Sequence, residues 1–182
     1  MLIISQNLAK YGMPFPEGTI YRINLAWLNN IEELVEILEH HRSHLIFLDL
    51  PVGRVKPPDN KYAIEDLIPI IRSHEHIKYF AVSNVESSKD ISKYIKLLSK
   101  NILVVPKIES ACGIANIREI TDSLPGPEKI IMLDHDDLYS SLERMNEPLS
   151  KFTVYVNELV DFCNKNRITL LRTRGIIFSD KL

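Results

Sequence analysis

Short apolar runs alternate with longer amphipathic segments along the chain. Seven runs rich in Ile, Leu and Val have the length of buried strands, and they span residues 2–5, 19–23, 44–48, 78–83, 102–106, 129–133 and 168–171. Apolar residues three and four positions apart predict helices over the segments 29–42, 63–74, 88–100, 113–123 and 149–166. Strands and helices in this alternation predict a parallel sheet with helices outside it, either doubly wound or closed into a barrel.

Polar residues at the carboxyl ends of the predicted strands favour the barrel. They are Arg22 and Asn24, Asp49, Ser83, Lys107 and Glu109, Asp137, and Arg172 with Thr173. Such side chains converge only if the strands close around a common axis. We therefore expect one domain over residues 1–182, an α/β (β/α)8-type TIM barrel. Because the chain stops after the seventh predicted strand, we expect a shortened barrel without the eighth strand and helix.

Lys107 and Glu109 lie two residues apart at the end of the predicted strand 102–106. Side chains alternate across a strand, so both should point to one side while Ile108 points to the other. The two residues form either a structural ion pair or a grip for an anion and a metal ion. The two residues alone do not decide between these interpretations.

Composition and charge exclude several classes of partner. The 182 residues are 45% hydrophobic and 25% charged, and the formal net charge of -2 gives no basic field for nucleic acid. The apolar runs are too short for a membrane span, and the N-terminus has no secretory signal pattern, so we expect no membrane partner and place the protein in the cytoplasm. No Gly-rich nucleotide motif follows the first predicted strand.

The cysteines and histidines do not predict a zinc site. Cys112 and Cys163 have neither CxxC nor metal-ligand spacing, so we expect small buried thiols in a reducing compartment. His40 and His44 lie four residues apart without an acidic partner between them, which is typical of a solvated helix end.

The order of the strand ends resembles the catalytic barrel of pyruvate kinase. The stretch "VVPKIESACG" is similar to the family's Lys-Ile-Glu-x-x-x-Gly motif, and "IIMLDHDDL" to its Met-x-Ala-Arg-Gly-Asp-Leu. The stretches "YRINLAWL", "LIFLDLP", "FAVSNVESSKD" and "ITLLRTRGI" resemble its other strand ends in the same order. The agreement in order and spacing runs from about Arg22 to Gly175.

This resemblance implies phosphoryl transfer between phosphoenolpyruvate and ADP, with phosphoenolpyruvate or pyruvate as the small-molecule ligand. Lys107 would neutralise the phosphoryl group and the enolate, while Glu109 and Asp137 would hold Mg²⁺, or Mn²⁺ in its place. Arg22 would contact the phosphate and Thr173 would lie near the enol carbon. The remaining substrate-binding residues implied are Asn24, Asp49, Ser83 and Asp136.

Several positions depart from the pyruvate kinase pattern. Ala26 and Leu50 stand where the family has two of its K⁺ ligands, so the resemblance does not support a K⁺ site. Asp134 and Asp136 fall in a loop whose N–H groups receive the substrate carboxylate in the family, and two added acids should repel it. The family's lid domain and C-terminal domain have no counterpart, so we expect weak or no kinase activity.

Two other classes remain open. Metal-dependent pyruvate aldolases and the citrate lyase β family share the barrel, and "DDLYSSLE" resembles their Asp-Leu-x-x-Ser-Leu-Gly motif. That resemblance implies a C–C lyase that stabilises a pyruvate enolate with a metal ion and an arginine. The third class is a non-catalytic relative that binds a phosphoenolpyruvate-like ligand or a protein.

A gap between the first and seventh strands would leave two unpaired strand edges. The apolar residues Ile176, Ile177 and Phe178 lie beyond the seventh predicted strand. We expect them to pack across the gap or against a second subunit, which predicts a homodimer.

Overall fold

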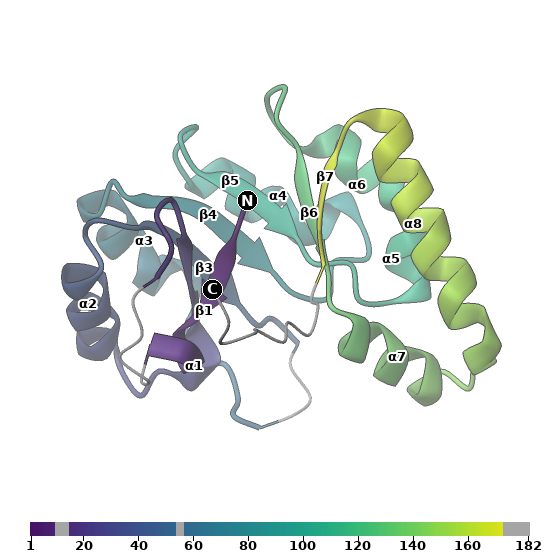
Figure 1. The fold of residues 1–182 in the computed structure, drawn as a ribbon, viewed down its shortest axis with the longest axis horizontal. Coiled ribbons are helices and arrows are strands. Elements are labelled where there is room, and N and C mark those ends of the chain that lie inside the picture. Colours follow the sequence, from purple (N-terminus) through teal and green to yellow (C-terminus); the bar gives the residue numbers. More distant parts are fainter. Residues whose placement is uncertain (10–14, 54–56, 173–182) are drawn as a thin grey trace, which may run out of the picture.

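The computed structural model describes residues 1–9, 15–53 and 57–172, with seven strands separated by helices (Figure 1). The strands are β1 Ile3–Ser5, β2 Ile20–Asn24, β3 Leu45–Leu50, β4 Ile77–Val82, β5 Leu103–Pro106, β6 Ile130–Leu133 and β7 Thr169–Arg172. The helices are α1 Gln6–Ala9, η1 Leu25–Trp27, α2 Ile31–His40, α3 Ile64–Ser73, α4 Ser88–Leu97, α5 Ala111–Ala115, α6 Ile117–Ser123, α7 His135–Arg144, η2 Leu149–Lys151 and α8 Phe152–Asn166. Each strand overlaps a predicted apolar run.

All strand pairs in the described residues are parallel. Strands β1 to β5 form one sheet in chain order, and β6 pairs with β7 in a second sheet. A backbone bridge between Lys107 and Met132 joins the two sheets. No ladder joins β7 to β1 within the described part of the chain, so the strands there do not close into a complete barrel. The architecture is a parallel α/β array with helices outside it.

The inner faces of the strands share one apolar cluster, which makes the array barrel-like. Its buried members come from β2 to β6 and are Ile20, Phe47, Tyr79, Ala81, Val105, Ile130 and Met132. Ile3 of β1 and Leu171 of β7 pack against the same cluster. Because side chains two positions apart point the same way, the residues that follow this cluster along each strand also face inward. A larger cluster fills the space between the outer faces and the helices.

Helix boundaries differ from the predicted ones in two places. The predicted helix 113–123 is divided into α5 and α6, with Asn116 between them. Helix α7 is absent from the sequence prediction because Leu138 and Leu142 are its only buried apolar side chains, which is a weak stripe. Asp134 is its N-cap, a signal that sequence reasoning could have used.

Gly113 allows α5 to approach the loop after β4 closely. A Cβ atom at this position would lie 2.6 Å from the carbonyl oxygen of Val85, a contact that a real side chain could not make. The N–H of Gly113 also donates a hydrogen bond to Oγ of Ser110 at 3.1 Å. The glycine of the motif therefore positions the turn that follows Glu109.

Several predictions concern the surface and the chain ends. Thr173 and the tail residues 176–178 lie outside the described residues, so the homodimer stays a prediction. No helix in the described ranges has the length and apolar character needed to cross a bilayer. Cys163 is buried as predicted, whereas Cys112 is exposed, which corrects the expectation of two buried thiols.

Candidate functional site

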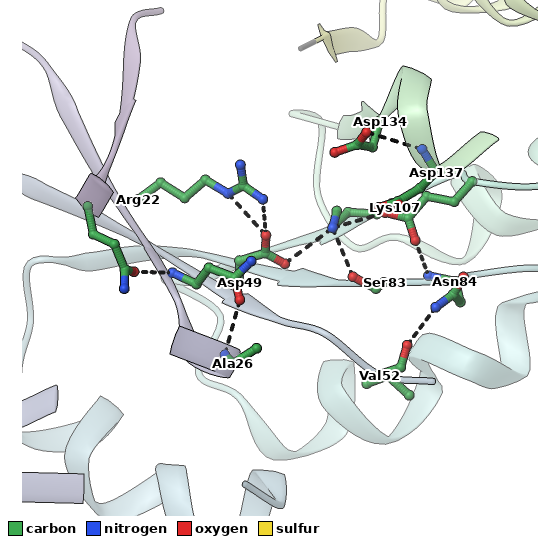
Figure 2. A network of polar contacts seen from close by, with 12 residues as sticks. Arg22, Ala26, Asp49, Val52, Ser83, Asn84, Lys107, Asp134 and Asp137 are labelled. Atoms are coloured by element: carbon green, nitrogen blue, oxygen red, sulfur yellow. Dashed lines mark hydrogen bonds and ion pairs between the residues drawn. The ribbon is translucent and has the colours of Figure 1, made fainter. Parts of the chain in front are cut away.

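Charged side chains meet at the carboxyl ends of β2, β3 and β5, and Lys107 lies at their centre (Figure 2). Its Nζ atom is 2.9 Å from Oε1 of Glu109 and 3.6 Å from Oδ1 of Asp49. The same ammonium group donates a hydrogen bond to Oγ of Ser83 at 2.9 Å. Only 5% of the Lys107 side chain is exposed. Two carboxylates and a hydroxyl group therefore hold a buried lysine with almost no water around it.

Asp49 connects Lys107 to Arg22. The Nε and Nη2 atoms of Arg22 both donate to Oδ2 of Asp49, Nε at 3.0 Å. The Asp49 side chain is fully buried, whereas 17% of the Arg22 side chain is exposed. Asp49 therefore anchors a guanidinium group that reaches toward solvent.

Glu109 is positioned from the backbone by Asn84. The N–H of Asn84 donates to Oε2 of Glu109 at 2.8 Å, and Nδ2 of Asn84 donates to the carbonyl oxygen of Val52 at 2.7 Å. Asn84 has a φ of 54°, a conformation that asparagine adopts more readily than most residues. Sequence analysis did not identify Asn84, and its only signal is an asparagine directly after a strand end.

The pKa values show how burial and charge compete in this network. Burial raises the pKa of Asp49, but Lys107 and Arg22 outweigh it and hold this pKa below its usual value. Burial lowers the pKa of Lys107, but Asp49 and Glu109 raise it above its usual value, so the ammonium stays charged. Burial raises the pKa of Glu109, and the charge of Asp137 adds to this, with only partial compensation from Lys107. Glu109 is thus the carboxyl group of this network that gains most from an additional cation.

Two buried carboxylate oxygens, Oδ1 of Asp49 and Oε1 of Glu109, accept no hydrogen bond within the described residues. Their nearest charged partner is the Lys107 ammonium group, 2.9 Å from Oε1 of Glu109 and 3.6 Å from Oδ1 of Asp49, and it is shared between the two carboxylates. A buried acceptor without a donor costs roughly 1–3 kcal/mol. These oxygens therefore mark the place where a further donor or cation would be stabilised.

The donor set fits a hard divalent cation. No group of three His, Cys, Asp or Glu side chains gathers into a metal site in the part of the chain that the structure describes. Mg²⁺, however, is usually bound through one or two carboxylates together with water and substrate oxygens. Glu109 and Asp137 supply two carboxylates close enough for the charge of Asp137 to raise the pKa of Glu109. The unsatisfied Oε1 atom of Glu109 completes the fit.

Asp134 takes the backbone groups at the start of α7. Its Oδ1 atom accepts hydrogen bonds from the N–H groups of Asp136 at 3.1 Å and Asp137 at 3.4 Å. We expected Asp134 to repel a substrate carboxylate, and the structure adds that its own carboxylate occupies those N–H groups. Asp136 is exposed, and its part in substrate binding stays a prediction.

The remaining candidate residues have structural contacts. Oδ1 of Asn24 accepts a hydrogen bond from the N–H of Ala26 at 3.0 Å, which shapes the turn after β2. Arg172 does not enter the network around Lys107, and its Nε and Nη2 atoms lie 3.2 and 3.0 Å from Nε2 of His135. This contact ties the end of β7 to the start of α7. Thr173, the other residue predicted at this strand end, is outside the described residues.

Two cavities open at the opposite end of the strands and include none of these side chains. One is lined by Ile77 and Ile102 at the start of β4 and β5, and the other by Lys129 and Ile168 just before β6 and β7. The charged network is therefore defined by its side chains and not by a deep apolar cavity.

Comparison with known proteins identifies a structural relative but no sequence family. No protein-family profile matches the chain, and no curated protein sequence matches it. Among solved structures, the chain is similar to the crystal structure of RipC from Yersinia pestis, with a TM-score of 0.62 and 15% sequence identity. The match covers 98% of this chain and 77% of RipC. At this identity the similarity shows the fold.

The similarity to RipC overturns the interpretation as a pyruvate kinase relative. The structural match lies with RipC, and it favours the second class that the sequence left open over the first. Neither phosphoryl transfer between phosphoenolpyruvate and ADP nor a role in glycolysis is supported. The Lys-Ile-Glu motif was misleading because alternating polar residues at a strand end show only that two side chains share one face. The chain therefore shares the fold of RipC.

Proposed function

We propose that the chain is a metal-assisted carbon–carbon lyase that acts on a small carboxylate substrate at the carboxyl ends of β2, β3, β5 and β6. The observation that carries the proposal is the buried Lys107 between Asp49 and Glu109, with the charge of Asp137 acting on Glu109. The fold of RipC, which this chain shares, supports the proposal.

Arg22 is the proposed anchor for the substrate carboxylate. Asp49 holds Nε and Nη2, and within the described residues Nη1 makes no hydrogen bond. The exposed part of the guanidinium group can therefore donate to a carboxylate from solvent, the anion whose geometry it matches. Because Asp49 fixes the group beforehand, little side-chain entropy is lost on binding.

Lys107 is the proposed stabiliser of the enolate. In the retro-aldol cleavage of a 4-hydroxy-2-oxo acid, the hydroxyl group gives its proton to a solvent base, the C3–C4 bond breaks and C4 becomes an aldehyde carbonyl. The electron pair of the broken bond forms an enolate at the C2 carbonyl, and this enolate then takes a proton from solvent at C3. A buried ammonium group fixed by three neighbours stabilises the developing negative charge without reorganisation. Lewis-acid polarisation of the same carbonyl is the chemistry that Mg²⁺ supplies when Glu109 and Asp137 hold it.

The proposal is tested by exchange of the methyl protons of pyruvate with deuterium oxide, followed by NMR with and without Mg²⁺. We expect Mg²⁺-dependent exchange that falls at least tenfold in Glu109→Gln. Glu119→Gln is the control, because Glu119 is an exposed carboxylate on α6 whose hydrogen bonds go to Ser88. Asp137→Asn should also reduce exchange, and Glu143→Gln, an exposed substitution on the same helix, should not.

Two results would contradict the proposed lyase. One is wild-type protein that does not exchange pyruvate protons above the buffer rate with Mg²⁺ or Mn²⁺. The other is exchange that survives unchanged in Glu109→Gln. A thermal shift caused by oxalate with Mg²⁺ but no exchange would favour the third class, a binding protein without catalysis.

A further inference from the structure

We infer that Asp134 determines specificity at this site and restricts it to substrates that carry a single carboxylate. The inference rests on the proposed function in one respect, the role of Arg22 as the carboxylate anchor. It adds the substrate class: a 2-oxo or 2-hydroxy monocarboxylate whose other end is uncharged.

The position of Asp134 follows from the alternation along β6. Met132 belongs to the inner apolar cluster, so the side chain two residues later starts from the same face of the array. Figure 2 shows Asp134 above Lys107, with its carboxylate turned toward the side on which Arg22 lies. The charge of Asp134 contributes to the raised pKa of Arg22, which places the two groups within electrostatic reach.

The carboxylate of Asp134 is also held in a fixed place. The two N–H groups of α7 bind its Oδ1 atom, so the charge cannot swing away when an anion approaches. The N–H groups at a helix N-terminus commonly bind anions, and here an internal carboxylate already uses two of them. A second carboxylate on the substrate would find this negative charge where free donors would otherwise be.

The charges around Arg22 also disfavour a second carboxylate on the substrate. Arg22 already faces Asp49 in direct contact, and Asp134 and Glu109 act on it from farther away. One substrate carboxylate can share the exposed edge of the guanidinium group. A dianion meets the field of three carboxylates, and repulsion grows with each charge that it carries.

Titration calorimetry with glycolate and oxalate tests this inference. These are two-carbon acids with one and two carboxylates, and the buffer contains EDTA so that no metal ion takes part. Asp134→Asn removes the charge and keeps the cap, because asparagine is as good an N-cap as aspartate. Glu143→Gln is the matched control, since it removes one exposed charge from the same helix.

We expect Asp134→Asn to strengthen oxalate binding about tenfold and glycolate binding about threefold. Loss of the Asp134 charge should improve the binding free energy of the dianion about twice as much as that of the monoanion. In Glu143→Gln both affinities should change less than about twofold, because an exposed charge is screened by solvent and salt. Equal changes in the two variants, or an unchanged ratio of oxalate to glycolate affinity in Asp134→Asn, would overturn the inference.

Arg22→Gln separates failure of the inference from failure of the proposed function. If glycolate binding is lost in Arg22→Gln while Asp134→Asn leaves the affinity ratio unchanged, only the specificity role of Asp134 is wrong. If glycolate binds equally well to Arg22→Gln, or neither anion binds to wild type and Asp134→Asn, the anchor role fails and the inference falls with it. Circular dichroism at the titration temperature verifies that each variant is folded.

Discussion

Adjacent residues of β2 face opposite environments. Tyr21 points to the helix side, where its ring stacks on His41 with centroids 3.9 Å apart, and Phe15 stacks on Tyr21 at 5.8 Å. Arg22 points to the inner side and pairs with the buried carboxylate of Asp49. One strand thus separates an aromatic stack from a network of charges.

The difference between the two faces lies in the presence of a counter-charge. Burial, with a further contribution from the charges of His40 and His44, lowers the pKa of His41 to about 4, so the stacked ring is neutral. On the inner face burial acts in the same sense on Lys107, yet Asp49 and Glu109 reverse its effect. Burial alone therefore does not decide whether a side chain is charged, because a fixed partner of opposite charge can outweigh it.

The largest effect is expected when the ammonium group of Lys107 is removed from the charged network. Lys107→Met should lower the free energy of unfolding at pH 7 by about 3–5 kcal/mol, because it leaves Asp49 and Glu109 as buried charges with one partner fewer. Urea unfolding measures this loss. The double variant Lys107→Met with Glu109→Gln should recover part of it, since both members of the pair are then uncharged.

Lys100→Met is the control for this prediction, because Lys100 is exposed in the turn before β5 and should change stability by less than about 0.5 kcal/mol. A loss in Lys107→Met no larger than in this control would show that the buried network does not depend on its lysine.

A smaller effect concerns the neutral His41 on the helix side of β2, and it depends on pH. The pKa of His41 in the folded protein, about 4, lies below the usual value of 6.5, so the unfolded chain binds this proton more readily. The free energy of unfolding should therefore decrease as the pH falls from about 6.5 toward 4. His41→Phe keeps a ring in the stack and should make this decrease shallower. The measurement is a pair of urea unfolding series between pH 7 and pH 4.5.

The difference between the two series isolates His41 from the other titrating groups. His41→Gln, which removes the ring and the charge together, should flatten the curve in the same way but lower stability at pH 7. Parallel curves for wild type and His41→Phe would contradict the low pKa of His41.

The smallest effect concerns Asn84, which positions Glu109 in the charged network. Asn84→Gly keeps the N–H that Glu109 accepts but removes the hydrogen bond to Val52, so we expect a loss of about 1 kcal/mol. Asn84→Ala should cost about 1 kcal/mol more than Asn84→Gly, because alanine is strained at a φ of 54°. Thermal unfolding of the two variants measures the difference, and equal stability would show that this conformation carries no strain.

The alternation of side chains along the strands was sufficient to predict the inner face of the site. It placed Lys107 and Glu109 on one side of the chain, and the register of β2 and β3 sets Asn24 opposite Asp49 at the same edge. All seven strands could be predicted for the same reason, since each is a short apolar run bounded by polar residues.

Contacts that depend on local backbone geometry could not be predicted. The hydrogen bond from Asn84 to Glu109 requires a positive φ after β4, which no periodicity reveals. The spacing of His40 and His44 drew attention to the wrong histidines, because α2 ends at His40 and the turn then places His41 on Tyr21. The role of Asp134 depends on the turn that starts α7, a helix with too few apolar residues to be recognised.

The backbone of Lys107 is also the joint between the two sheets. Its N–H donates to the carbonyl oxygen of Val82 at 2.9 Å, and the N–H of Ile108 donates to that of Met132 at 2.8 Å. The backbone of Lys107 thus connects the first sheet to β6, which α7 follows. Its side chain pairs with the carboxylates of Asp49 and Glu109. A shear movement that separates the end of β5 from β6 would move Asp137 away from Glu109. Any ligand that bridges these two carboxylates would therefore connect the two sheets and would resist such movement.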